Sequence, residues 1–210
     1  MAQQIRGIVL EGLSCSGKTS LFRVLKQVQA AKDDGERNAV FLSEQYSQNL
    51  NLVNGQRKTL SQEENLLVLE RRLLLLEELA DYADGMGLYS HRARGLFFVL
   101  ERFHLNYGMC FPHADLSAVE RRLNHLNAQT VVLTVSPKKA AERLSQRAGE
   151  RVQDQAVEDW LKKQAQLTEL AKVSAVPTMI LNTDGMNWHE LAEELLKHSI
   201  LQGRAASGAL

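Results

Sequence analysis

Eight consecutive residues, 12–19, constrain this chain more than any other part of its sequence. They read Gly-Leu-Ser-Cys-Ser-Gly-Lys-Thr and match the phosphate-loop pattern G-x-x-x-x-G-K-[S/T] at every defined position. The apolar run 5–10 precedes them, and a helical pattern opens at Lys18. We therefore expect a strand, a glycine-rich loop and a helix in direct succession.

The chemistry of phosphate binding explains each position of this loop. Gly12 and Gly17 permit backbone torsions that a side chain would block, so the loop amides can point inward around an anion. The following helix adds its positive N-terminal dipole, Lys18 reaches the β- and γ-phosphates, and Thr19 offers its hydroxyl to magnesium. Cys15 is either a small polar filler, the role we favour, or a reactive thiol. We expect ATP and Mg²⁺ as ligands, and the predicted binding residues are Gly12, Ser14, Cys15, Ser16, Gly17, Lys18, Thr19 and Ser20.

Four further apolar runs follow along the chain, with helical patterns between them. Each run is short and apolar at successive positions, as expected of strands that are covered on both faces. Strands that alternate with helices favour a parallel sheet in an α/β fold. The expected strands are 5–10, 39–42, 96–100, 130–135 and 178–181, and the expected helices are 18–32, 61–82, 116–127, 138–147, 155–173 and 188–198. Helix-start signals occur at Ser61 with Glu64 and at Ser136 with Pro137.

Size and charge exclude several classes of protein. A chain of 210 residues can bury one sizeable core, and we expect a single domain over 1–201 with a flexible tail at 202–210. The 25 basic and 25 acidic residues cancel, which excludes a nucleic-acid binder held by bulk charge. The apolar stretch 66–79 contains five charged residues and is excluded as a membrane span. Residues 1–12 lack a signal-peptide run, and we expect a cytoplasmic protein with no membrane partner.

Later segments separate the classes of phosphate-loop protein. A GTPase should show DxxG after its third strand and NKxD near its fourth, and neither is present. Instead, Glu11 precedes the loop glycine, and Glu44 follows the second strand. The pair Glu101-Arg102 ends the third strand, and 141–147 read Ala-Glu-Arg-Leu-Ser-Gln-Arg after the fourth. In this order the segments resemble those of the thymidylate kinase and deoxynucleoside kinase branch of the nucleoside and nucleotide kinases.

The resemblance implies a three-layer phosphate-loop NTPase fold with an arginine-rich lid. Its sheet has five parallel strands in the order 2-3-1-4-5, with helices on both faces and the lid at about 142–153. Arg143, Arg147 and Arg151 are spaced by four, so they should share a face that could close over the phosphates. The alternative is a solvated face that pairs with Glu142 and Glu150.

The ends of the strands supply the remaining candidate site residues. In an open parallel sheet, ligands bind beyond the carboxyl ends of the strands, where Glu44, Glu101 and Arg102 should gather. Glu101 is expected to hold magnesium with Thr19, and Arg102 to hold the acceptor or its phosphate. Glu44 is either a general base for an acceptor hydroxyl or a solvated carboxylate. The predicted catalytic set is Lys18, Glu44, Glu101, Arg102, Arg143 and Arg147.

The residues leave the phosphoryl acceptor open. We expect an ATP-dependent phosphotransferase acting on a nucleoside, a nucleoside monophosphate or another small hydroxyl compound. Its pocket should lie between the second strand, the helix from Ser61 and segment 101–111. A nucleotide-binding regulatory protein and an antibiotic-modifying phosphotransferase on the same scaffold are alternatives.

His104 could reach the site or be structural, and a homodimer remains open. Four aromatic residues could stack a base or belong to the core: Tyr46, Phe103, Tyr107 and Phe111.

Overall fold

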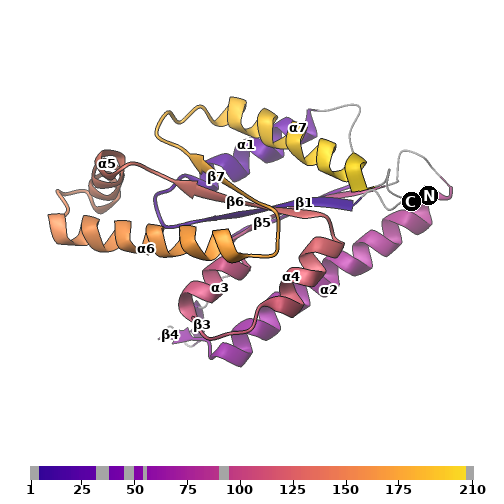
Figure 1. The fold of residues 1–210 in the computed structure, drawn as a ribbon, viewed down its shortest axis with the longest axis horizontal. Coiled ribbons are helices and arrows are strands. Elements are labelled where there is room, and N and C mark those ends of the chain that lie inside the picture. Colours follow the sequence, from indigo (N-terminus) through magenta and orange to yellow (C-terminus); the bar gives the residue numbers. More distant parts are fainter. Residues whose placement is uncertain (1–4, 32–37, 45–49, 54–55, 90–94, 207–210) are drawn as a thin grey trace.

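The computed structural model of the chain describes residues 5–31, 38–44, 50–53, 56–89 and 95–206. Its centre is a parallel five-stranded sheet in the order β2-β5-β1-β6-β7 (Figure 1). Counted along the predicted strands, this order is 2-3-1-4-5, so the predicted topology is confirmed. The strands of this sheet are β1 (Ile5–Gly12), β2 (Ala39–Leu42), β5 (Leu96–Glu101), β6 (Ala128–Thr134) and β7 (Thr178–Asn182).

Helices cover both faces of the sheet and give the predicted three layers (Figure 1). Helices α1 and α7 lie side by side on one face, where Leu25 and Leu195 are fully buried. Helices α2, α3, α4 and α6 cover the other face, around Leu73, Phe98 and Val132. Every residue of β1 and β5 is buried, which explains why these strands are apolar at successive positions. The helices are α1 (Lys18–Ala30), α2 (Gln62–Gly87), α3 (His104–Cys110), α4 (Ser117–His125), α5 (Pro137–Ala148), α6 (Asp154–Val173) and α7 (Trp188–Ala206).

The two predicted helix starts have the expected cap geometry. The Ser61 hydroxyl accepts the backbone N–H of Glu64 at 3.2 Å, and the Glu64 carboxylate accepts the N–H of Ser61 at 2.8 Å. This reciprocal pair satisfies two donors that the first turn of α2 leaves free. The Ser136 hydroxyl caps α5 by accepting the backbone N–H of Lys139 at 3.4 Å, and Pro137 occupies the first helical position. The N–H of Ser136 itself donates to Asp184 Oδ1 at 2.9 Å.

Some elements lie outside the predicted pattern. Strands β3 (Leu50–Val53) and β4 (Gln56–Thr59) form an antiparallel hairpin, and α3 is a short helix that no apolar periodicity marks. Helix α7 continues to Ala206, so it covers the first part of the tail expected at 202–210. No helix in the described part of the chain is long and apolar enough to cross a membrane.

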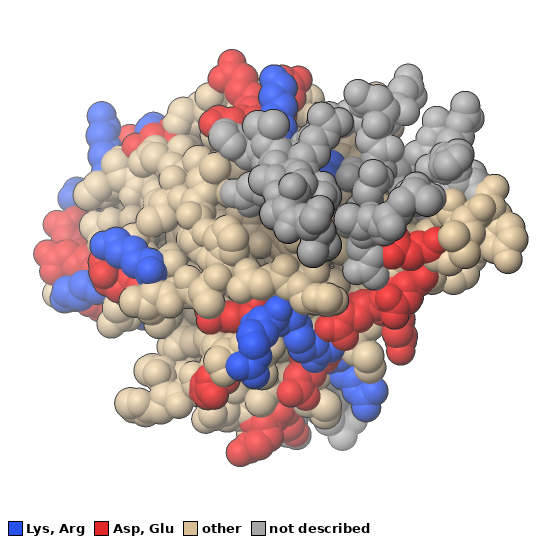
Figure 2. All heavy atoms as spheres, turned by 45° about the vertical axis from the view of Figure 1, so that its right-hand side comes forward, with Lys and Arg blue, Asp and Glu red and all other residues tan. Residues whose placement is uncertain are grey.

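The sheet brings distant parts of the sequence to one edge. Leu10 pairs with Glu101 across β1 and β5, and Gly12 pairs with Leu133 across β1 and β6. Because the strands are parallel, their carboxyl ends meet where the phosphate loop leaves β1. On the face that Figure 2 shows, the described basic side chains lie among acidic ones and do not form one basic surface.

Candidate functional site

The two loop glycines occupy positions where a side chain cannot fit. Gly12 has φ +144, and a Cβ there would lie 2.6 Å from the Ser16 hydroxyl and 2.9 Å from the Leu133 carbonyl oxygen. Gly17 has φ +96, and a Cβ there would lie 2.3 Å from the Trp188 ring. Both requirements, a left-handed or unusual torsion and close packing, select glycine. Gly17 also precedes α1 without a side-chain cap, which leaves the first amides of α1 available to an anion.

Three side chains hold the carbonyl groups of the loop from outside. The Trp160 indole donates to the Ser14 carbonyl oxygen at 3.0 Å, and the Thr183 hydroxyl donates to the Ser16 carbonyl oxygen at 2.8 Å. Between them, the Arg143 guanidinium donates to the Cys15 carbonyl oxygen at 3.4 Å. Fixing three successive carbonyls orients the peptide dipoles of the loop, which favours amides directed toward an anion. Sequence reasoning missed Trp160 and Thr183, because hydrogen bonds to backbone carbonyls leave no local pattern.

The Lys18 side chain folds back into the phosphate loop. Its Nζ donates to the Leu13 carbonyl oxygen at 2.8 Å, and the side chain is 4% exposed. Burial, aided by the charge of Arg102, lowers the pKa of Lys18 to about 8, although nearby carboxylates oppose the shift. An ammonium held this deep is desolvated, so it interacts with a phosphate more strongly than a surface lysine would.

Thr19 and Glu101 lie together as predicted. The Thr19 hydroxyl donates to Glu101 Oε1 at 2.8 Å, and the backbone N–H of Glu44 donates to Glu101 Oε2 at 3.3 Å. Hydroxyl and carboxylate oxygens are the ligands that Mg²⁺ prefers, and Mg²⁺ commonly takes one or two of them together with substrate phosphates. The described residues include no group of three metal-binding side chains. The donors therefore fit a magnesium ion shared with a nucleotide rather than one enclosed by protein alone.

Arg102 joins the end of β2 to the phosphate loop. Its Nε lies 3.0 Å from Glu44 Oε2, and its Nη2 donates to the Ser14 hydroxyl at 3.1 Å. Arg102 has φ +56, a left-handed torsion that costs energy for a residue with a Cβ. This torsion turns the chain sharply after Glu101, so that the Arg102 side chain faces Glu44 and the loop. The predicted meeting of Glu44, Glu101 and Arg102 is thus present in the fold.

These residues enclose a cleft of about 460 Å³ beside the loop. The predicted residues in its wall are Ser14, Cys15, Gly17, Lys18, Thr19, Ser20, Glu44, Arg102, Arg143 and Arg147. Gln146, Met186 and Trp188 complete the wall, and none of the three was predicted. Gly12, Ser16 and Glu101 are buried behind it.

Arg143 and Arg147 reach the cleft from different environments. The Arg143 side chain is buried, and its guanidinium donates to the hydroxyl and the carbonyl oxygen of Thr183. Arg147 is exposed, with Nη1 4.0 Å from the Cys15 sulfur. Arg143 is therefore anchored to the end of β7, whereas Arg147 is free to change its position at the mouth of the cleft.

The predicted common face of three arginines is wrong for Arg151. Helix α5 ends at Ala148, and Gly149 follows with φ +76, a left-handed C-terminal cap. Arg151 thus leaves the helix, and its 89% exposed side chain lies 4.0 Å from Asp154. Among the described residues, no ion pair joins these arginines to Glu142 or Glu150, the alternative partners; Glu142 pairs with Lys139 at 2.6 Å.

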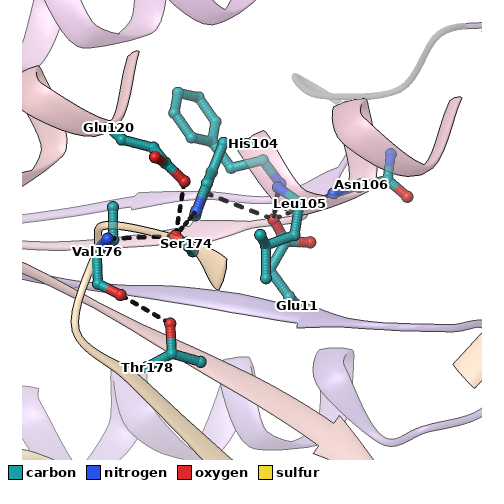
Figure 3. Close-up of polar contacts among 9 residues, drawn as sticks. Glu11, His104, Leu105, Asn106, Glu120, Ser174, Val176 and Thr178 are labelled. Carbon is teal, nitrogen blue, oxygen red and sulfur yellow. Dashed lines mark hydrogen bonds and ion pairs between the residues drawn. The ribbon is translucent and has the colours of Figure 1, made fainter. Parts of the chain in front are cut away.

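A buried polar network lies behind the cleft (Figure 3). Glu11 Oε1 accepts the backbone N–H groups of Phe103, Leu105 and Asn106, at 2.9, 3.0 and 3.4 Å. Burial raises the pKa of Glu11 to about 7, even though these hydrogen bonds and the charge of Lys18 lower it. Glu11 therefore fixes the turn from β5 into α3 immediately after Arg102.

His104 continues this network away from the cleft. Its Nε2 lies 3.4 Å from the Ser174 hydroxyl, which donates to the Glu120 carboxylate at 2.7 Å (Figure 3). Burial lowers the pKa of His104 to about 3, so its imidazole is neutral. Of the two roles considered for His104, the contacts favour the structural one.

Helix α2 contains a buried arginine beside Phe103 that sequence reasoning missed. Arg72 on α2 is 7% exposed, its guanidinium carbon lies 5.5 Å from the centre of the Phe103 ring, and burial lowers its pKa to about 10. Its Nε and Nη2 have no hydrogen-bond partner among the described residues. The signal in the sequence was an arginine at a core position of the leucine-rich helix. Phe103 and Tyr107 belong to the core, and Tyr46 lies outside the described residues.

Comparison with known proteins supports the fold. No family model matches the chain, and no curated protein does. The solved structure of YorR protein from Bacillus subtilis, in complex with phosphorylated GDP, is similar with a TM-score of 0.62 at 13% identity. This similarity covers 94% of this chain and 98% of that one. A gluconokinase from Sinorhizobium meliloti 1021 matches with a TM-score of 0.47 at 16% identity, over 94% and 99% of the two chains. The chain therefore shares its overall fold with the solved structure of YorR protein.

Proposed function

We propose that this protein is an ATP-dependent phosphotransferase, similar to thymidylate and deoxynucleoside kinases. It would transfer the γ-phosphoryl group to a nucleoside, a nucleoside monophosphate or another small hydroxyl compound. The observation that carries the proposal is the Glu44–Arg102 pair, which faces the phosphate loop across one cleft. A nucleotide-dependent switch has no use for a carboxylate and a guanidinium opposite the triphosphate, whereas a transfer enzyme needs groups that position an acceptor there.

In this proposal the loop residues bind and orient the triphosphate. The amides of the loop and of the start of α1 hold phosphate oxygens, and Lys18 neutralises charge on the transferring group. Arg147 supplies a further cation from the mouth of the cleft. Thr19 and Glu101 would hold magnesium, which when bound neutralises the charge of the phosphates.

The acceptor would lie on the side of Arg102 and α2. If the acceptor is a hydroxyl, Glu44 is placed to take its proton as a general base. If the acceptor is a phosphate, Arg102 is placed to bind it. Arg72 does not line the cleft, but its Nε and Nη2 have no hydrogen-bond partner among the described residues. They would suit a carbonyl or phosphate oxygen of an acceptor that extends from the cleft to α2, because an unpartnered buried guanidinium is costly.

We further propose that 142–153 acts as a lid and that the chain forms one domain. Arg143 anchors the segment at Thr183, and the Val152 N–H donates to the Ser145 hydroxyl at 3.1 Å. Between these two contacts, Arg147 is exposed at the cleft and the glycine-capped turn after Ala148 is exposed to solvent. Movement of Arg147 and of this turn would close the cleft over bound phosphates while Arg143 keeps its contact with Thr183.

The test of the proposed function is an acceptor screen. Purified protein with MgATP is incubated with nucleosides, nucleoside monophosphates and aminoglycosides, and ADP release is measured. We expect release that depends on an acceptor, with a nucleoside or nucleotide as the best one. Release only with an aminoglycoside would favour the antibiotic-modifying alternative. Tight MgATP binding without transfer to any acceptor would contradict the proposal and favour a regulatory protein.

A further inference from the structure

Trp160 on α6 contacts the phosphate loop with one part of its side chain and an apolar cluster with the other. Its indole N–H donates to the Ser14 carbonyl oxygen at 3.0 Å. The side chain is 9% exposed and packs in a cluster with Val135, Ala140 and Val157. An indole has a large apolar surface and a single hydrogen-bond donor, so burial of the ring in the cluster fixes the direction of that donor.

This cluster joins the phosphate loop to the proposed lid. Leu13 packs against it from the loop, Leu144 from α5, and Val152 from the segment after the turn at Gly149. Helices α5 and α6 lie next to each other there (Figure 1). Side chains in one close-packed cluster cannot move independently, because the packing leaves few voids. The position of Trp160 therefore depends on the order of the lid.

Helix α6 is also fixed to the sheet one turn beyond Trp160. Gln164 Oε1 accepts the backbone N–H of Val135 at 2.9 Å, and Gln164 Nε2 donates to the Val135 carbonyl oxygen at 3.1 Å. Gln164 follows Trp160 by four positions, so both side chains lie on one face of α6. The indole thus reaches the loop from a helix that is held just beyond the end of β6.

The hydrogen bond from Trp160 sets the direction of a loop amide. The Ser14 carbonyl and the Cys15 N–H belong to one planar trans peptide, in which the two groups point in opposite directions. Because the carbonyl points to Trp160, the Cys15 N–H points away from α6. Cys15 lines the cleft and Trp160 does not. The Cys15 N–H is therefore placed to bind a phosphate in the cleft.

We propose that Trp160 is a positioning residue that couples the order of the lid to the shape of the phosphate loop. The inference rests on the proposed nucleotide site and lid, and it adds the residue that connects them. Closure of the lid would tighten the cluster around the indole, and the indole would hold the Ser14 carbonyl more firmly. By linkage, a loop that Trp160 holds in this shape binds the nucleotide more tightly and favours the closed lid.

Replacement of Trp160 by phenylalanine keeps an aromatic ring in the cluster and removes the N–H donor. Isothermal titration with a non-hydrolysable ATP analogue and Mg²⁺ should show an affinity lower by roughly fivefold, the effect of losing one hydrogen bond. Thr168→Val on the same helix is the matched control, because the Thr168 hydroxyl donates to the Gln164 carbonyl oxygen at 2.9 Å and not to the loop. The control should bind the analogue like the wild type, and urea unfolding should show that both variants are folded. Wild-type affinity in Trp160→Phe would overturn the proposal.

Leu144→Ala tests the lid side of the coupling. Leu144 does not line the cleft, so its truncation should weaken analogue binding only through the cluster. In the Trp160→Phe background the same truncation should have no further effect, because the hydrogen bond through which it acts is already lost. Unchanged affinity in Leu144→Ala, or an equal loss in both backgrounds, would overturn the coupling. Failure of the wild type to bind the analogue would instead refute the proposed nucleotide site, and this inference with it.

Discussion

The buried carboxyl group of Glu11 gives the fold a specific dependence on pH. The side chain is fully buried, and all three of its backbone hydrogen bonds reach one oxygen, Oε1. The other oxygen, Oε2, has no hydrogen-bond partner among the described residues. Burial raises the pKa of Glu11 from its ordinary 4.5 to about 7. The folded protein therefore keeps a proton on Glu11 over a range of pH in which the unfolded chain has lost it.

The sign and size of the effect follow from this difference in proton binding. Between pH 4.5 and about 7 the folded state binds more protons than the unfolded state, so the free energy of unfolding falls as pH rises through this window. Above about pH 7 both states are deprotonated at Glu11, and its contribution becomes constant. At 1.36 kcal/mol per pKa unit, the whole loss amounts to about 3 kcal/mol.

Glu11→Gln removes this titration and preserves the size of the side chain. Buried amide hydrogens will shift the stability of the variant by a constant amount, so the slope with pH is the informative quantity. Urea unfolding of both proteins at pH 5, 6, 7 and 8 should show the variant gaining about 2 kcal/mol relative to wild type. Glu193→Gln, an exposed position on α7, is the control and should show no such trend. A constant difference between Glu11→Gln and wild type would refute the reasoning.

Three further predictions concern the cleft. Lys18→Ala should lower turnover by about a hundredfold or more, while circular dichroism shows an intact fold. Near-normal turnover in this variant would contradict the assignment of the phosphate loop. With a hydroxyl acceptor, Glu44→Gln should lower kcat more than it raises the acceptor KM; with a phosphate acceptor, Arg102→Ala should be the more damaging change. Full activity in both variants would place the acceptor elsewhere. Hydrogen exchange in 142–153 should slow with a non-hydrolysable ATP analogue, and identical exchange in both states would count against a lid.

The layer structure was predictable from the sequence because it depends on short-range signals. The loop at 12–19, the apolar runs and the caps at Ser61 and Ser136 all act within a few residues, and each has its expected place in the fold. The proximity of Glu44, Glu101 and Arg102 was also predictable, because each follows or ends a strand and a parallel sheet aligns the carboxyl ends of its strands.

The residues that support the site were not predictable, because they act over long separations in the chain. Trp160 binds the loop from α6, and Thr183 binds it from the end of β7, both through backbone carbonyls. The short helix α3 depends on Glu11, which lies 92 positions before Phe103. For Arg151, a local pattern gave a wrong prediction. Its four-residue spacing from Arg147 suggested a shared helix face, but the helix ends at Ala148, before the left-handed Gly149.

Equilibrium binding of MgATP is the most direct test of the central claim, that the loop at 12–19 is a nucleotide site. Isothermal titration of the wild-type protein with a non-hydrolysable ATP analogue should give one site per chain. Affinity should fall when EDTA removes magnesium, because in our proposal the ion links the nucleotide phosphates to Thr19 and Glu101. The analogue should also raise the melting temperature of the protein, and the increase should continue with the logarithm of its concentration above the dissociation constant. The absence of both heat and thermal stabilisation at millimolar analogue would contradict the account.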